Sequence, residues 1–429
     1  WLKMPIEQSL PPLHAMIHCV ACDNTGLLLK DLCPLCEGTV ADGACEDDSL
    51  VFGQQSKGGA PRGPPYCRSH SAYREELGNA LLALYKLDAD RNDAFIMPSG
   101  MTAISATMSS LAAPCGRASM IVHGDELYCD VQRAVAHLVE LHAPSLTSTA
   151  VDVRDHHAIR KIFLEHGSKI SVFHFEACTN ASSQLFNFSL IPELRSLAPD
   201  CVFVVDNTWL SAALFNPFDY GVDVVVESLT KYVSAGRCIG GAVIGRSDCV
   251  AKVWTWIKVF GIFVAADHCK IFLQGLQSMY TRVGKASSNA LQLAHHLDSH
   301  RSVTRVMYPL LASHPSHDLA MKYLARGGPG CVWFHVKASK SKLMQSLGSL
   351  ELKTSFGGCR ARVNPWPVVA SPEAYEFPRP DAEQHGQKGV WLRVSVGYQQ
   401  NVAEVIAQID AMLEAAVPQV SNEGGIQKF

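Results

Sequence analysis

Lys231 lies in the stretch VESLTKYVSAGRCIGG (residues 226–241), directly after Thr230 and close to Ser228. A lysine after an apolar run is usually a solvated charge, because burying an ammonium group costs free energy. Burial and nearby positive charge can instead lower its pKa, and the neutral amine is then a nucleophile toward aldehydes. Which role Lys231 has depends on the residues that the fold brings beside it.

Polar residues follow four other apolar runs in the same way. They are Ser99-Gly100 after AFIMP, Tyr128 after SMIVHG, Glu176 after SVFHF and Asp206 after CVFVV. The carboxyl ends of parallel strands meet at one edge of a sheet, and ligands of such sheets bind there. We therefore expect these groups and Lys231 to lie together.

These residue types are the ones that pyridoxal phosphate (PLP) requires. PLP needs an amine for its aldehyde and an acid that keeps its pyridine nitrogen protonated. Asp206 is suited to the second task, although an aspartate there is also a common helix cap. The hydroxyls of Ser228 and Thr230 can face one phosphate. Tyr128 can stack on a ring, or it is simply a core residue.

Ser99, Gly100 and Met101 open a predicted helix. The first amide groups of a helix bind anions, because they have no intrahelical acceptor and lie at the positive end of the helix dipole. This stretch is therefore a second candidate for holding the phosphate.

The elements that must position these residues are predicted by the alternation of short apolar runs with helical patterns. This alternation indicates an α/β fold with a parallel-rich central sheet and helices on both faces. From about residue 270 a long helical segment, two strand-like runs and a last amphipathic helix predict a smaller C-terminal α+β domain. We predict an N-terminal arm (residues 1–72), a large domain (73–270) and a C-terminal domain (271–429).

The composition narrows the class of protein. The chain has 429 residues, of which 48% are hydrophobic and 18% charged, with a net charge of −3. These values predict a folded protein with no nucleic-acid partner. We find no apolar stretch long enough for a membrane span and no N-terminal signal pattern, so we expect no membrane partner. The odd number of cysteines, 15, is typical of reduced thiols and favours a cytoplasmic location.

Two CxxC pairs near the N-terminus raise the question of a zinc site. Cys19 and Cys22 precede Cys33 and Cys36 with a gap of ten residues. Zinc binding and a plain cysteine-rich arm both remain open, because this gap is shorter than usual for a zinc site. We therefore assign no metal ligands.

Several motifs together resemble the Cys/Met-metabolism PLP enzymes, which include cystathionine γ-synthases, cystathionine γ- and β-lyases, methionine γ-lyases and homoserine sulfhydrylases. The motifs are DNTWLSAALFNPFDYGVDVVVESLTKY (206–232), PSGMTAISATMSSLAAP, GDELYCDVQR and LRVSVG. The resemblance runs from about Tyr66 to about Leu413. It implies PLP as cofactor and the PLP-dependent transferase fold type I, the fold of aspartate aminotransferase.

The resemblance also implies roles for single residues. Lys231 matches the lysine that binds PLP covalently and moves protons, and Asp206 matches the partner of the pyridinium. The remaining cofactor-binding positions are Thr208, Ser99, Gly100, Met101, Ser228, Thr230 and Tyr128. Tyr128 matches the tyrosine that stacks on the ring, and the resemblance also implies a catalytic role for it in acid/base steps. Tyr66 and Arg68 match residues that reach the phosphate of the neighbouring subunit, which implies a homodimer as the minimal unit and a homotetramer as the expected assembly.

Substrate contacts follow from the same resemblance. Arg393 matches the arginine that binds the α-carboxylate of an amino acid substrate. Asn180 and Ser355 match residues close to it.

The chain departs from the family pattern near the predicted side-chain end of the substrate pocket. Arg360 stands where many of the lyases carry an acidic residue, and Arg362 follows it. These two cations suit a substrate with a distal anion, or they are surface charges.

We predict PLP-dependent γ-elimination or γ-replacement on an amino acid, as in a cystathionine γ-synthase. The alternatives are a cystathionine or methionine γ- or β-lyase and, in another class, a catalytically silent PLP-fold interaction protein.

Overall fold

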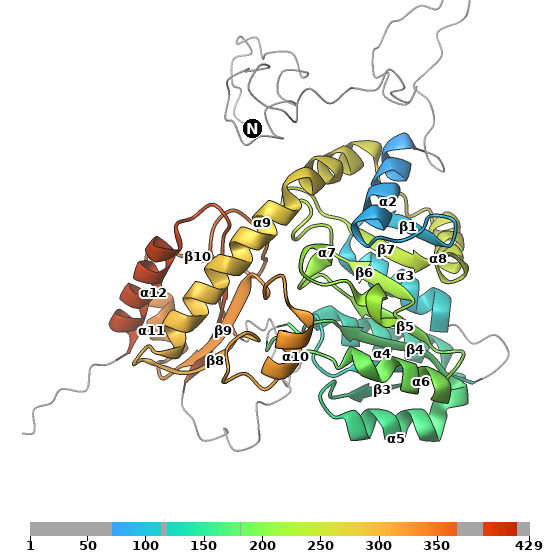
Figure 1. Cartoon of the computed structure of the whole chain (residues 1–429), viewed down its shortest axis with the longest axis horizontal. Helices are drawn as coiled ribbons and strands as arrows, with labels where there is room; N and C mark the ends of the chain where they lie inside the picture. Colours follow the sequence, from blue (N-terminus) through green and yellow to red (C-terminus); the bar gives the residue numbers. More distant parts are fainter. Residues whose placement is uncertain (1–70, 113–117, 181, 367–388, 418–429) are drawn as a thin grey trace, which may run out of the picture.

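The computed structural model describes residues 71–112, 118–180, 182–366 and 389–417, with the side chains of 365 and 366 left aside. Two sheets with their helices lie side by side (Figure 1). Tyr66, Arg68 and the four cysteines of the CxxC pairs lie outside the described residues, so the predictions for them stay predictions.

The first sheet has seven strands in the order β1-β7-β6-β5-β4-β2-β3. Its strands are β1 (Asn92–Met97), β2 (Ser119–Gly124), β3 (Leu146–Val151), β4 (Ile170–Glu176), β5 (Val202–Asp206), β6 (Val224–Glu227) and β7 (Gly241–Arg246). Strands β2 to β6 are parallel to one another, whereas β7 pairs antiparallel with both β6 and β1. Strand β7 returns antiparallel because no crossover helix separates it from β6.

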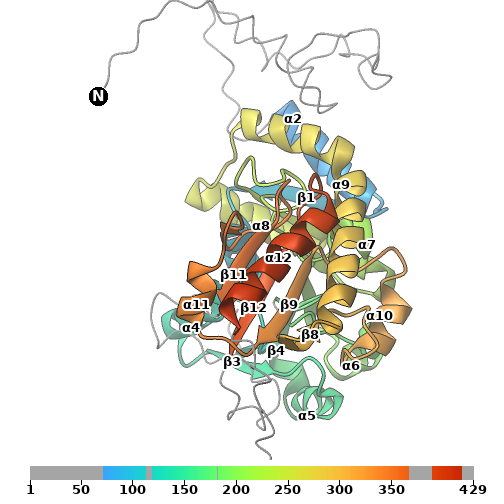
Figure 2. The ribbon, with the colours of Figure 1, turned by 90° about the vertical axis from the view of Figure 1, so that its left-hand side faces the viewer.

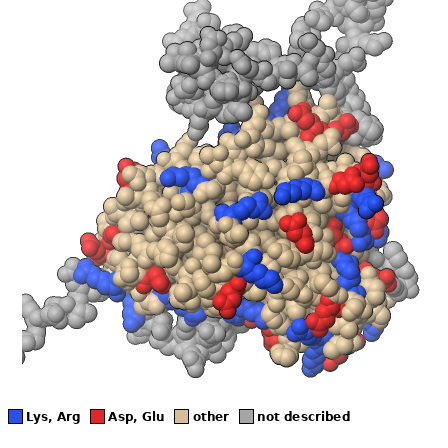
Figure 3. All heavy atoms as spheres, viewed as in Figure 1, with Lys and Arg blue, Asp and Glu red and all other residues tan. Residues whose placement is uncertain are grey.

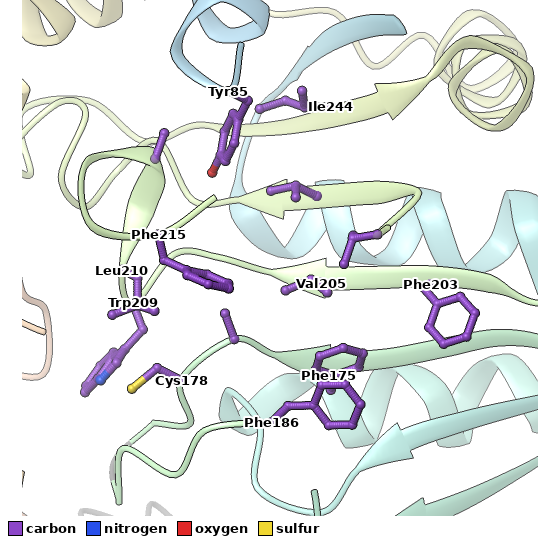
Figure 4. Close-up of a cluster of buried hydrophobic side chains, with 14 of the residues drawn as sticks. Tyr85, Phe175, Cys178, Phe186, Phe203, Val205, Trp209, Leu210, Phe215 and Ile244 are labelled. Carbon is purple, nitrogen blue, oxygen red and sulfur yellow. The ribbon is translucent and has the colours of Figure 1, made fainter. Parts of the chain in front are cut away.

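The inner strands are apolar on both faces because helices cover both sides of the sheet. Every residue of β5 and β6 is buried. On one side the sheet packs against α3, α4 and α8. The other side carries a cluster of aromatic side chains, with Phe175, Phe186, Phe203 and Phe215 packed over the strands and Trp209 at its margin (Figure 4).

The helices of this part are α2 (Ala72–Leu84), α3 (Gly100–Ala112), α4 (Cys129–His142), α5 (His156–His166), α6 (Ile191–Leu197), α7 (Ser211–Leu214) and α8 (Ser247–Phe260). Short 3₁₀ turns are η2 (Gly167–Lys169), η3 (Phe188–Leu190) and η4 (Pro217–Tyr220).

The second sheet has five strands in the order β10-β11-β12-β9-β8. They are β8 (Val303–Met307), β9 (Cys331–Val336), β10 (Glu351–Leu352), β11 (Arg362–Trp366) and β12 (Val390–Ser395). Its helices are α9 (Ala266–Asp298), α10 (His317–Tyr323), α11 (Lys340–Gln345) and α12 (Val402–Ala416). Helices α9 and α12 cover one face of this sheet with apolar side chains (Figure 2).

Helix α9 connects the two parts of the molecule. It has 33 residues and packs against α2 near one end and against α12 and the second sheet near the other. The predicted domain boundary between residues 270 and 271 falls inside this helix, so the domain limits stay a prediction.

The uncovered face of the second sheet is turned toward the carboxyl edge of the first sheet. Arg393 of β12 reaches Asn180, which follows β4, and the Gly330 amide donates to the Tyr232 hydroxyl at 2.9 Å. The predicted site residues therefore lie where the two sheets meet.

No helix among the described residues is both long and apolar enough to cross a membrane. On the face drawn in Figure 3, positive and negative side chains are interspersed.

Candidate active site

The five polar groups predicted at strand ends lie at one edge of the first sheet. Strands β1, β2, β4, β5 and β6 all run in the same direction, because β1 and β6 are both antiparallel to β7. Ser99, Tyr128, Glu176, Asp206 and Lys231 each come at or just after the carboxyl end of one of them. The topology thus brings together residues that are up to 132 positions apart in the sequence.

Lys231 lies in the turn after β6, with its amide donating to the Ser228 carbonyl at 3.1 Å. Its Nζ is 3.3 Å from the Ser355 hydroxyl and 5.5 Å from the ring centroid of Phe356. Burial lowers the pKa of Lys231, and the nearby Arg393 guanidinium lowers it further. Both effects favour the neutral, nucleophilic amine.

Asp206 is buried at the end of β5, and one of its carboxylate oxygens accepts the Thr208 amide at 2.8 Å. Burial raises the pKa of Asp206, while the Thr208 hydrogen bonds and the charge of Lys231 act in the opposite direction. A buried carboxylate is costly unless a cation or hydrogen-bond donor meets it. A protonated pyridine nitrogen would supply both.

The start of α3 packs tightly against Ser228. A Cβ on Gly100 would lie 2.8 Å from the Ser228 Cβ, so a larger residue at position 100 would force the two segments apart. The Ser99 hydroxyl accepts the Thr102 amide at 3.0 Å, while the amides of Gly100 and Met101 belong to the first turn, which has no intrahelical acceptors. The chemistry of these donors fits a phosphate group.

Thr208 and Thr230 both stabilise the loop that carries Lys231. The Thr208 hydroxyl accepts the Ser228 amide at 2.8 Å. The Thr230 hydroxyl accepts the Gly240 amide at 3.0 Å and donates to the Gly240 carbonyl at 3.2 Å. Thr230 therefore directs its proton to the backbone here, and its predicted phosphate contact stays a prediction.

Two buried glutamates hold the loops that carry Tyr128 and Asn180. Glu176 accepts the Tyr128 amide at 2.5 Å and the Asn180 amide at 2.9 Å. Glu126 accepts the Thr179 hydroxyl at 2.9 Å and the Ser182 amide at 2.8 Å. Burial raises the pKa of both carboxyl groups.

Tyr128 itself is 40% exposed at the edge of the site. Partial burial, with the neighbouring Cys129 and Asp130, raises its pKa to about 12. The phenol therefore stays protonated at neutral pH. Its ring is available to stack on a ligand, and its hydroxyl can donate a hydrogen bond.

Arg393 is buried on β12 and links several predicted substrate contacts. One terminal nitrogen donates to the Asn180 Oδ1 at 2.8 Å, and the other donates to the Thr354 carbonyl, next to Ser355. The guanidinium carbon lies 5.7 Å from the ring centroid of Trp209. Arg393, Asn180 and Ser355 thus come together with Lys231 although they lie on different elements.

The sequence prediction missed Arg282, a buried arginine in the middle of α9. Its guanidinium donates to the carbonyls of Tyr232 at 2.7 Å, Val233 at 3.0 Å and Gly275 at 2.7 Å. It therefore supports the backbone directly after Lys231. The sequence signal was an arginine on the apolar face of a helix, between Met279 and Ala286.

Gly357 was also missed as a specific requirement of the site. Its φ of +81° favours glycine, and a Cβ there would lie 2.8 Å from the Lys231 carbonyl carbon. The loop of residues 354–358 can therefore lie directly on the Lys231 backbone, which places Ser355 beside the amine.

Together these residues fit PLP. They offer a partly buried amine for its aldehyde, a buried acid for its pyridine nitrogen and helix-terminal amides with a serine for its phosphate. Among the described residues, no group of three or more His, Cys, Asp or Glu side chains is placed to hold a metal ion.

Comparison with known proteins agrees with this fit. A cystathionine β-lyase of Coxiella burnetii is 27% identical over 329 residues, covering 75% of this chain and 80% of the lyase. An L-alanine/L-glutamate racemase of Wolbachia pipientis is 28% identical over 193 residues, 43% of this chain, and the match spans only 47% of the racemase. The structure of cystathionine γ-synthase from Xanthomonas oryzae pv. oryzae, in complex with aminoacrylate and cysteine, has a TM-score of 0.71 at 24% identity and covers 83% of this chain and 88% of that one.

The family described as Cys/Met metabolism PLP-dependent enzymes matches residues 41–414. The resemblance, the α/β fold of PLP-dependent transferase type I and PLP as the cofactor are thereby confirmed. The chain belongs to the Cys/Met metabolism PLP-dependent enzymes and is a lyase or transferase of the trans-sulfuration group.

Proposed function

We propose that this enzyme catalyses γ-elimination or γ-replacement on an amino acid, with chemistry like that of a cystathionine γ-synthase. The observation that carries the proposal is the environment of Lys231. Its amine is partly buried, 3.3 Å from Ser355, and close enough to Arg393 and Asp206 for both charges to act on its pKa. One amine thus lies near a buried guanidinium and a buried acid.

Bound PLP would supply an electron sink for negative charge on the substrate carbons. Asp206 would hold the proton on the pyridine nitrogen. The amides of Gly100 and Met101, with Ser99, Ser228 and Thr230, would hold the phosphate. Tyr66 and Arg68 of a second subunit would complete the phosphate site, as the family resemblance implies.

Lys231 would move protons as well as hold the cofactor. γ-Chemistry requires removal of protons from Cα and then Cβ of the substrate. A group that both accepts and donates a proton works best with a pKa near the working pH, and burial moves the pKa of Lys231 in that direction. The hydrogen bond to Ser355 orients the amine. The family resemblance implies that the Tyr128 phenol assists in acid/base steps, and the raised pKa of about 12 makes it a weak acid before cofactor and substrate bind.

Arg393 would take the α-carboxylate of the substrate. A guanidinium binds a carboxylate through two parallel hydrogen bonds, which fixes orientation as well as position. The hydrogen bond to Asn180 at 2.8 Å orients the guanidinium.

A γ- or β-lyase is the second candidate, because the Coxiella relative bears the name cystathionine β-lyase. A γ-synthase and a lyase differ in the final step: a thiol adds to the substrate in the γ-synthase, whereas the lyase releases a keto acid and ammonia. We further propose a homodimer, expected to form a homotetramer, in a reducing compartment such as the cytoplasm. The free thiols of all cysteines among the described residues support the last point.

The test is the visible absorption spectrum of the purified protein, recorded before and after addition of homoserine esters, cystathionine and methionine. A cofactor band that changes with one amino acid, followed by a thioether or keto acid product, would establish the reaction. A colourless protein that takes up no added PLP would contradict the proposal and favour a catalytically silent role. Sedimentation of the same sample measures the assembly.

A further inference from the structure

We infer that Arg362 selects substrates whose γ-substituent carries a negative charge, such as a dicarboxylate half-ester or a phosphate ester. This inference rests on the proposed function and specifies its substrate class. Arg360 was an equal candidate from the sequence, and the structure separates the two.

Arg362 and Arg393 lie on the same face of the second sheet. In the register of β11 and β12, Arg362 is opposite Ser395 and Asn364 is opposite Arg393. The two arginines are therefore diagonal neighbours on adjacent strands, a position in which the Cα atoms of two residues are about 7–8 Å apart. Val363 and Val394 point the other way, into the core under α9 and α12. This geometry aims both cations at the space beside Lys231.

The guanidinium of Arg362 lies against the loop that carries Ser355. A Cβ on Gly358 would be 3.4 Å from each terminal nitrogen of Arg362, so the glycine leaves the guanidinium room to lie flat on the loop. The preceding residue, Gly357, packs on the Lys231 backbone. The charge of Arg362 also contributes to the lowered pKa of Lys231, after burial and Arg393.

The local charge balance leaves this region cationic. Glu351 is the one acid that pairs with Arg362 among the described residues, at 3.5 Å, and the same carboxylate also pairs with Lys353 at 3.5 Å. One carboxylate thus faces two cations. Arg360 is exposed and lies before the strand begins, so it is a poor candidate for the same task.

Two cations on one sheet face near Lys231 suit a substrate with two anions. Arg393 would bind the α-carboxylate, as proposed above, and Arg362 would meet a terminal carboxylate or phosphate on the γ-substituent. A distal ammonium group would be repelled by the same charge, whereas a neutral ester would gain nothing from it.

The test compares kcat and KM for O-succinyl-, O-phospho- and O-acetylhomoserine in the PLP-loaded enzyme. In Arg362→Leu, we expect KM for a charged ester to rise about 10- to 100-fold, the range of a lost charged hydrogen bond, with kcat little changed. KM for the acetyl ester should change by less than about twofold. The succinyl and phosphate esters together show which anion is preferred.

Three further variants test whether the charge of Arg362 itself causes the preference. Arg360→Leu is the matched control and should leave all three KM values unchanged. Arg362→Lys should retain most of the preference for a charged ester, because it keeps the charge. Glu351→Gln removes the ion pair but not the cation, so the preference should persist.

Equal losses for charged and neutral esters in Arg362→Leu, or the same losses in Glu351→Gln, would overturn the inference and leave Arg362 a purely structural residue. Failure of all three esters to react while cystathionine or methionine reacts would also overturn the inference. Failure of the esters, cystathionine and methionine alike would instead overturn the proposed function.

Discussion

The Arg393 guanidinium on β12 donates to the side-chain oxygen of Asn180 at 2.8 Å across the junction between the two sheets. The two residues are 213 positions apart in the chain. The backbone amide of Asn180 in turn donates a hydrogen bond to the Glu176 carboxylate at the end of β4. The proposed carboxylate binder is therefore positioned by both sheets, and any change in their relative placement would move it.

Replacement of this arginine should weaken substrate binding. Arg393→Lys keeps the charge but loses the planar two-donor geometry, so we expect KM for amino acid substrates to rise about 10- to 100-fold. Steady-state kinetics would measure the change. Arg133→Lys, on the exposed face of α4, is a matched control and should leave KM unchanged. An unchanged KM in Arg393→Lys would exclude this residue as the carboxylate binder.

Replacement of Lys231 should abolish covalent attachment of PLP. Borohydride reduction of the wild-type protein should add the mass of pyridoxyl phosphate, and Lys231→Ala should show no such addition. Activity should fall at least about 100-fold, because the group that moves protons is lost. Lys252→Ala, an exposed lysine on α8, should behave as wild type. Labelling of Lys231→Ala at another lysine would show that the amine was assigned wrongly.

Gly100→Ala should disturb the phosphate site. The added methyl group would lie 2.8 Å from the Ser228 Cβ, so we expect a loss of about 1–3 kcal/mol in unfolding free energy together with weaker retention of PLP. Gly284→Ala on α9 is the control. A Cβ there meets no atom within 4 Å, so this variant should be stabilised by about 0.5–1 kcal/mol. Thermal unfolding and the ratio of bound PLP to protein check both outcomes.

His174 should make the protein sensitive to acid. It is fully buried on β4, and burial together with the neighbouring His123 lowers its pKa to about 3. In the unfolded chain a histidine binds a proton below about pH 6.5. The unfolded state therefore binds more protons than the folded state between these values. Stability should fall by about 1.4 kcal/mol for each pH unit below about 6.5.

The variant His174→Leu should flatten this dependence between pH 6.5 and the acid limit of folding. Urea unfolding at several pH values measures it. The exposed His137 on α4, replaced by alanine, is the control and should leave the slope as in wild type. Identical slopes in wild type and His174→Leu would argue that other groups dominate, such as the buried His314, whose pKa burial lowers to about 4.

Much of the site could be predicted because its residues follow apolar runs. A buried strand must be apolar, so Asp206 stands out directly after VFVV, and Lys231 stands out four positions after the end of VVVE. Parallel order then requires that such residues share an edge. The antiparallel return of β7 was not expected in detail, because it depends on the loop between Lys231 and Gly241 having no helix.

Other parts of the site carried no usable sequence signal. Arg282 acts through three backbone carbonyls, and nothing local in the sequence indicates which carbonyls a buried arginine will reach. Glu126 was an ordinary acidic residue until the loop that it holds was placed around it. The sequence put Glu176 at the sheet edge but did not indicate which amides it would accept. The choice between Arg360 and Arg362 depends on where β11 begins, because Arg360 is exposed and lies before the strand whereas Arg362 is its first residue.

The sequence by itself determined the alternation of strands and helices, the apolar strands and the polar residues at their ends, because each of these depends on neighbours within a few positions. Only the tertiary structure decided which distant groups meet. Ser355 reaches Lys231 across 124 positions, and it does so because Gly357 lets its loop lie on the lysine backbone. Such contacts depend on how two sheets pack, and packing is a property of the whole chain.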